Sequence, residues 1–158
     1  MSLLPFFQSF YQSGIGVAIR NSTWLFPAIR VFHLLGFGLT AGAVLVANLP
    51  LLGVGLSRQP AAQVYAAALP YLIGGVTVMF LSGIPLFLSE SIKCYYSFAF
   101  WVKMTSLFLV LLFTFTVQRH VTQTGLTSDR SQLGRLTALI SLGLWSAVAW
   151  GGRWIGFS

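Results

Sequence analysis

The sequence has few charged residues and almost no acidic ones. Only 7% of its 158 residues are charged, against roughly 25% in an average soluble domain. The acidic residues are limited to Glu90 and Asp129. So little charge could not keep a folded surface in water, which excludes an ordinary soluble domain and indicates a lipid environment. Because 56% of the residues are hydrophobic, we expect one membrane domain whose main partner is the lipid bilayer.

Cysteine and clustered basic residues are equally scarce. Cys94 is the single cysteine, so it cannot form an intramolecular disulfide, and no Cys/His spacing resembles a zinc site. The nine basic residues are scattered in ones and twos, whereas nucleic-acid binding would require a basic patch. We therefore expect no nucleic-acid partner. The first basic residue is Arg20, so the charged start of a cleavable signal peptide is not expected.

Four stretches are apolar enough to span a bilayer, each near the roughly 20 residues that a membrane helix needs. They cover about residues 25–52, 66–88, 98–117 and 136–154. No segment alternates apolar and polar residues as a membrane barrel does, and helices otherwise satisfy the backbone in lipid. Short connections make sequential helices antiparallel. The sequence therefore predicts an all-α membrane protein, an antiparallel four-transmembrane-helix bundle that forms a single domain over residues 1–158.

Two further features refine this architecture. Apolar residues recur at helical spacing over about residues 3–19, which predicts a short N-terminal helix lying in the membrane interface. The alternative is a frayed start of the first span. Glycines in the first two spans are expected to let helix backbones approach closely. These glycines are Gly36, Gly38, Gly42, Gly74, Gly75 and Gly83.

His33 is the most informative single residue, because an ionisable side chain inside a membrane span is costly and usually functional. Helix rise places ionisable residues from all four spans in the half of the bundle that holds the N-terminus, called face A here. They are Arg30, His33, Glu90, Lys103 and Arg153. His120 ends the third span at the opposite side, face B, roughly 20 Å or more from His33. The two histidines therefore cannot ligate one haem within a monomer.

Angular positions, at about 100° per residue, favour the same region. Each span carries a narrow polar wedge that should face the bundle interior rather than lipid. The wedges consist of Arg30, His33, Thr40, Val44 and Asn48, then Met79, Gly83 and Glu90, then Lys103, Thr114 and Gln118, and finally Ser146 and Arg153. We therefore predict a polar cleft that opens to face A.

Aromatic residues crowd the same side. They include Trp24, Phe26, Tyr95, Tyr96, Phe98, Phe100, Trp101, Trp150 and Trp154. An interfacial belt explains part of this pattern, but a belt should form on both faces. A ring-shaped ligand in the cleft, or another membrane subunit docked at face A, would account for the excess.

Several segments resemble a family of uncharacterised bacterial four-span inner-membrane proteins. In the first helix they are Trp24-Leu25-Phe26-Pro27, His33-Leu34-Leu35-Gly36 and Leu51-Leu52-Gly53, and later ones are Leu88-Ser89-Glu90, Lys103-Met104 and Gly152-Arg153-Trp154. The resemblance covers nearly the whole chain from Trp24 onward. It implies a bacterial inner membrane but no established activity. Relatives often have an acidic residue about four positions before the histidine, where this chain has Ile29 and Arg30, so a carboxylate–histidine pair is not expected. Four-helix membrane cytochromes and copper-resistance membrane proteins show a looser likeness.

The flanking charges predict an orientation. Face B flanks carry Arg58, Arg119, Arg130 and Arg135, and face A flanks carry Arg20, Lys93 and Arg153. By the positive-inside rule, face B then lies in the cytoplasm, and the N- and C-termini lie in the periplasm.

The cleft predicts cofactor binding, with a b-type haem or a quinone beside an electron-transfer system. His33 could ligate haem iron, with Met79 at nearly the same depth as a second ligand. Basic side chains could hold propionates, since arginine pairs with carboxylates. The predicted cofactor-binding residues are His33, Arg30, Lys103, Arg153, Glu90, Met79, Trp24 and Trp101. The simpler interpretation of His33 is an interhelical hydrogen bond.

Two other functions remain open. The chain could be a non-catalytic accessory subunit of a larger respiratory or photosynthetic complex, because it is small and aromatic. It could instead transport protons or small ions through His33, Glu90 and Lys103, although the face B half offers only Asn48, Thr114 and Gln118 for a polar path. No nucleophile–base pair, paired carboxylates or metal-ligand spacing is present, so an enzyme acting alone is not expected.

Overall fold

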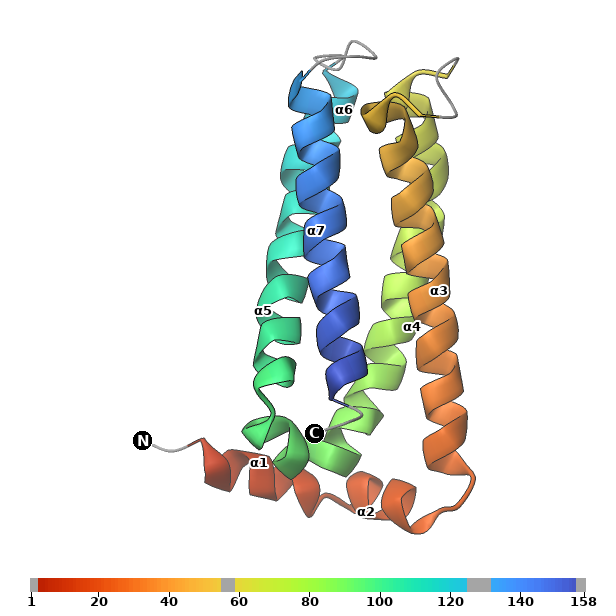
Figure 1. Ribbon diagram of the computed structural model, residues 1–158. Coiled ribbons are helices and arrows are strands. Elements are labelled where there is room, and N and C mark those ends of the chain that lie inside the picture. Colours follow the sequence, from red (N-terminus) through yellow and green to blue (C-terminus); the bar gives the residue numbers. More distant parts are fainter. Residues whose placement is uncertain (1–2, 55–58, 125–131, 156–158) are drawn as a thin grey trace.

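The structure is a computed structural model that describes residues 3–54, 59–124 and 132–155, and their secondary structure is helical throughout (Figure 1). Two short helices, α1 (Leu4–Tyr11) and α2 (Gly14–Asn21), lie across one end of a bundle of long helices. The long helices are α3 (Leu25–Leu52), α4 (Ala61–Tyr96), α5 (Phe98–Phe113), which continues through the π-helical turn η1 (Thr114–Gln118) into α6 (Arg119–Gln123), and α7 (Gln132–Trp154).

In the described residues, four of these helical segments are long and apolar enough to cross a membrane. They run up and down in turn, so that the C-terminal end of α3, the start of α4, α6 and the start of α7 lie at the end of the bundle opposite α1 and α2 (Figure 1). The predicted all-α bundle of four spanning helices is therefore confirmed. The end that holds α1, α2 and the C-terminal end of α7 is face A.

The helical segments are longer than their apolar parts. The second predicted span, 66–88, lies within α4, which runs from Ala61 to Tyr96, and the third continues to Gln123. The fourth begins at Gln132 rather than near residue 136. The predicted interfacial helix is two helices, because the chain breaks at Ser13, whose side chain accepts a hydrogen bond from the Gly16 amide and caps α2. Hydropathy identifies only the apolar part of a helix that crosses the lipid. Polar residues can continue the same helix beyond that part, so the helices are longer than the predicted spans.

The helices pack unevenly around the bundle. Contacts are extensive between α3 and α4 and between α5 and α7, and a smaller seam joins α3 to α7. Only a few residues of α4 and α5 approach each other. The bundle is therefore closed along three seams and loosely packed along the fourth, between α4 and α5.

Glycine residues allow the backbones of α3 and α4 to approach each other closely. A Cβ atom built on Gly75 would lie 2.8 Å from the Thr40 amide nitrogen and 2.9 Å from the Gly36 carbonyl oxygen. The predicted packing role is thus confirmed for Gly36 and Gly75. It is wrong for Gly38, Gly42 and Gly74, where an added Cβ would meet nothing within 4 Å. Small residues allow helix backbones to approach only where they face a neighbour.

A buried hydrogen-bond ring joins three helices in the face B half. The Gln118 side-chain amide donates to Asn48 Oδ1 at 3.2 Å, and the Asn48 amide donates to Ser141 Oγ at 3.3 Å. Ser141 Oγ in turn donates to Gln118 Oε1 at 3.1 Å. All three residues are buried, which confirms the predicted inward direction of Asn48 and Gln118. The expectation for Ser146 is wrong, because it is exposed and α7 instead buries Ser141, Trp145 and Val148.

Candidate functional site

A cavity of about 260 Å³ lies in the face A half of the bundle, beside the loosely packed α4–α5 seam. Its lining comes from all four spanning helical segments and is mainly apolar. The residues are His33 from α3, Val76, Met79, Phe80, Gly83, Ile84 and Phe87 from α4, Phe100, Lys103, Met104 and Leu107 from α5, and Trp145 from α7. We call this the His33 cavity. A mainly apolar pocket with a few convergent polar groups is typical of a small-molecule site.

The imidazole of His33 is fixed by Ser82 of α4. His33 Nδ1 lies 2.9 Å from Ser82 Oγ, and the single Ser82 hydroxyl proton is donated to the Val78 carbonyl at 2.6 Å. Ser82 Oγ therefore accepts from a protonated Nδ1, which leaves Nε2 unprotonated in the neutral ring. Gly83 provides the space, since an added Cβ would lie 3.3 Å from His33 Cε1. The simpler interpretation of His33, an interhelical hydrogen bond, is thus confirmed.

Lys103 reaches the same cavity from α5, guided by two glycines of α7. A Cβ added at Gly151 would lie 2.9 Å from Lys103 Cβ, and one added at Gly152 would lie 3.5 Å from Nζ. The start of the Lys103 side chain therefore packs against α7 where only a glycine, Gly151, leaves room, and its amino end lies at ordinary contact distance from a Cβ added at Gly152. In the described part of the chain no carboxylate faces Lys103 across the cavity, because Glu90 lines a different one. Its amino group is available as a hydrogen-bond donor.

Trp145 supplies a second donor. Its side chain is only 6% exposed, and its indole Nε1 is buried without a hydrogen-bond partner among the described residues. Tryptophan N–H groups usually have a partner when buried, and an unsatisfied buried donor costs roughly 1–3 kcal/mol. Trp145 lines the His33 cavity, and a ligand whose acceptor atom reaches Nε1 would remove this cost. The sequence interpretation did not single out Trp145.

The structure brings together only part of the predicted site. His33, Lys103 and Met79 line one cavity, and the Met79 sulfur lies 3.7 Å from Thr40 Oγ1. Glu90 lines the second cavity described below. The remaining predicted residues line neither cavity and are exposed: Arg30, Arg153, Trp24 and Trp101. Arg30 lies over the Phe26 ring at 5.9 Å, and Trp101 donates to the Tyr95 carbonyl.

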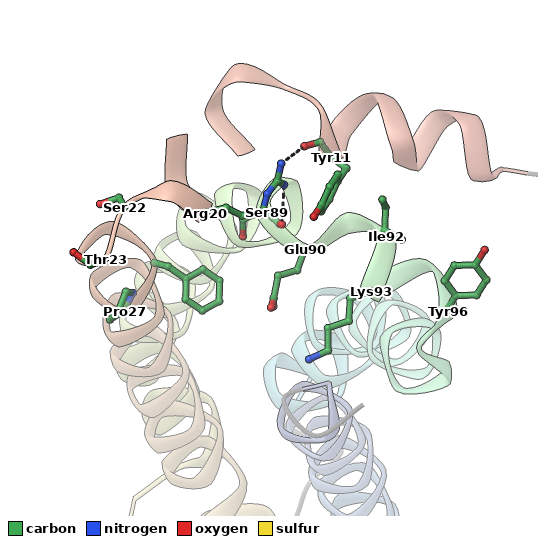
Figure 2. A pocket seen from close by; sticks show the side chains of 11 residues that line it. Tyr11, Arg20, Ser22, Thr23, Pro27, Ser89, Glu90, Ile92, Lys93 and Tyr96 are labelled. Carbon is green, nitrogen blue, oxygen red and sulfur yellow. Dashed lines mark hydrogen bonds between the residues drawn. The ribbon is translucent and has the colours of Figure 1, made fainter. Parts of the chain in front are cut away.

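The second cavity, of about 670 Å³, lies where α2 and the start of α3 meet the last turns of α4 (Figure 2). Its lining is more polar than that of the His33 cavity, and no residue lines both. The residues are Tyr11, Arg20, Ser22, Thr23, Phe26, Pro27, Ser89, Glu90, Ile92, Lys93 and Tyr96. We call this the collar cavity.

Arg20 holds the collar cavity together. Its guanidinium donates to the Ser89 carbonyl at 3.0 Å and to the Tyr11 carbonyl at 2.7 Å, and it lies 3.6 Å from the centre of the Tyr11 ring. Glu90 has the non-helical angles φ −125° and ψ 25°, which kink α4 beside the Ser89 carbonyl. Arg20 thus ties α1 and α2 to this kink. The sequence interpretation used Arg20 only as a flanking charge.

Together these features define the class of the molecule: a multi-pass helical membrane protein with one apolar cavity between its helices and one polar cavity at an end. The chain belongs to the family of unknown function DUF6644, whose model matches residues 15–158. Searches of curated proteins and of solved structures found no match. The predicted membership of a family without an assigned activity is confirmed.

Proposed function

We propose that the His33 cavity binds the ring of a quinone that diffuses in from the bilayer. The observation that carries the proposal is the juxtaposition of His33, Lys103 and Trp145 on an otherwise apolar cavity, together with the Trp145 Nε1 that has no partner among the described residues. A quinone combines an apolar ring with two carbonyl acceptors. Its chemistry therefore matches the walls and the polar groups together.

The three polar groups suit both redox forms of such a ring. Carbonyl oxygens of the oxidised form accept hydrogen bonds, which the Lys103 amino group and the Trp145 indole can donate. Hydroxyl groups of the reduced form donate, and His33 Nε2 can accept because Nδ1 carries the ring proton toward Ser82. Phe87 and Phe100, whose rings stack 5.6 Å apart at 16°, form an aromatic wall.

The size of the cavity favours a quinone ring over a haem. Pockets for drug-sized ligands measure about 300–1,000 Å³, and the His33 cavity is smaller, at about 260 Å³. A porphyrin exceeds a single ring several-fold in area, and its second axial ligand would have to be Met79. The Met79 side chain is buried against Thr40 in the close α3–α4 seam, which leaves the methionine little freedom to reach an iron.

The α4–α5 seam offers a route from lipid. Phe80 and Ile84 of α4 and Met104 of α5 line the cavity and are also exposed. In a bilayer these exposed side chains face acyl chains rather than water. A lipophilic ring can therefore enter sideways without crossing the polar end of the bundle.

Tryptophan fluorescence provides the test. Titration of purified protein with a short-tailed benzoquinone should quench the fluorescence saturably, because a quinone in the cavity contacts Trp145. Trp145→Phe should weaken binding by about threefold to tenfold, the loss expected for one hydrogen bond. Trp150→Phe, an exposed position on the same helix, should not. Non-saturable quenching that an alkylbenzene reproduces, or a Soret band in haem-supplied protein, would contradict the quinone assignment.

Other observations bear on the cellular location of the protein and on its partners. The family resemblance and the flanking charges support a bacterial inner membrane with periplasmic termini. The exposed aromatic side chains near face A, Trp24 and Phe98 among them, support a role beside a redox partner, or as an accessory subunit of its complex. Ion transport gains no such support, because Asn48, Gln118 and Ser141 in the face B half bond to one another.

A further inference from the structure

The collar cavity carries two opposite charges that do not neutralise each other. Glu90 and Lys93 both line it and are three positions apart on α4. Neither side chain forms an ion pair or a hydrogen bond within the described residues. The kink at Glu90 explains why, since residues three apart are neighbours only on a regular helix. Figure 2 shows both side chains leaving α4 toward the same space.

The third charge at this cavity is already engaged. The Arg20 guanidinium donates to two backbone carbonyls and lies over the Tyr11 ring. Bonds to neutral carbonyl groups leave the guanidinium charged but hold it in place between α1, α2 and α4. The charged side chains left without a hydrogen bond for a ligand are therefore the Glu90 carboxylate and the Lys93 ammonium. A ligand that complements them carries one ammonium and one anionic group, a few bonds apart.

The walls of the cavity are fixed rather than loosely placed. A Cβ added at Gly16 would lie 2.6 Å from the Leu88 carbonyl oxygen, so α2 packs directly on α4. Ser91 Oγ donates to the Phe7 carbonyl at 3.0 Å, which joins α1 to the segment after the kink. Specific contacts between α1, α2 and the end of α4 therefore fix the walls of the collar cavity.

The position of the cavity identifies the source of such a ligand. The helices α1 and α2 lie across the end of the bundle (Figure 1). Because the long helices have the length and hydropathy to cross a bilayer, we infer that this end lies at the membrane interface. Phe26, Pro27 and Ile92 add apolar surface to the same cavity. We propose that the collar cavity binds a phospholipid headgroup that carries both a phosphate and a primary ammonium, with Glu90 accepting from the ammonium and Lys93 pairing with the phosphate.

Native mass spectrometry of the full-length protein in mild detergent tests this assignment. Phosphatidylethanolamine, phosphatidylcholine and phosphatidylglycerol with identical acyl chains are the probes. The wild type should retain phosphatidylethanolamine about tenfold more than the other two, since the choline lipid has no N–H donor and the glycerol lipid has no ammonium. Equal retention of the three lipids by the wild type would overturn the proposal, and this measurement needs no variant.

Two variants separate the two charges. Glu90→Gln should abolish the preference for phosphatidylethanolamine while leaving phosphatidylglycerol retention unchanged or higher. Lys93→Gln should lower retention of both lipids. Arg119→Gln, at an exposed position in α6 at the opposite end, should change neither. A preference that survives Glu90→Gln in folded protein would contradict the proposal.

The soluble headgroup distinguishes the possible sources of the ligand. Phosphoethanolamine at high concentration should compete with the lipid for the same site, which shows that the headgroup is recognised. Intact lipid that persists at moderate phosphoethanolamine concentration identifies the bilayer as the source. Saturation by phosphoethanolamine with no lipid retained identifies the free compound instead.

Discussion

Lys103→Met should lower the affinity for a short-tailed benzoquinone by about tenfold or more. Methionine keeps the length of the aliphatic stem that lies beside Gly151 and Gly152, but it removes the strongest donor of the His33 cavity. A hydrogen bond from a charged group contributes roughly 1.5–3 kcal/mol, and each 1.4 kcal/mol is a tenfold change in affinity. The measurement is the saturable quenching of tryptophan fluorescence.

The control for Lys103→Met is a substitution at Arg30, a residue that the sequence assigned to the site and the structure does not. Arg30 belonged to the predicted site, but it is exposed and lines neither cavity. Arg30→Gln removes the same charge from the same half of the bundle and should leave the affinity within about twofold of wild type. Equal losses in both variants would mean that net charge near face A, and not the Lys103 contact, governs binding.

Gly75→Ala should lower the free energy of unfolding by about 1–3 kcal/mol, the usual cost of overpacking. We expect a value near the upper end of this range. The added methyl would collide with Thr40 Oγ1 and also with the amide nitrogen of Thr40 and the carbonyl oxygen of Gly36. Rotation of the Thr40 side chain cannot relieve the two backbone contacts, so α3 and α4 must move apart at this point. Unfolding in mild detergent, followed by circular dichroism against temperature, measures the effect.

The neighbouring glycine is the matched control. Gly74→Ala adds the same methyl one residue away, where nothing lies within 4 Å, and alanine favours the helix over glycine. Its melting temperature should stay the same or rise slightly. A comparable drop for both variants would show that glycine acts here through helix flexibility and not through the close approach of α3 to α4.

The architecture could be predicted from the sequence because the lipid environment determines it. Spans of apolar residues must become helices in lipid, and this reasoning located parts of all four spanning segments. It could not locate their ends, because the end of α4 around Glu90 is held by contacts with other helices: Ser89 accepts from Arg20 of α2, and Ser91 donates to Phe7 of α1. Sequence periodicity also could not tell Gly74 from Gly75, because which glycine faces a neighbour depends on how α3 and α4 pack.

The site was predicted in part. Helix counting placed His33 and Lys103 on one cavity, since depth and angle on each helix suffice for that. It assigned Arg30 and Arg153 inward although they are exposed, because long cationic side chains can extend to the interface. It chose Ser146 on α7 by its polarity. The stripe Ala138, Ser141, Trp145 and Val148, spaced three or four residues apart and buried, was the signal that would have identified Trp145.

Photolabelling tests the central claim most directly. Purified wild-type protein is irradiated with an azido-substituted short-tailed benzoquinone, and the modified peptides are mapped by mass spectrometry. If the His33 cavity binds quinone, adducts should concentrate on residues 76–87 of α4 and 100–107 of α5, and excess unlabelled quinone should suppress them. Adducts distributed over the lipid-facing surface, unaffected by competitor, would contradict the account.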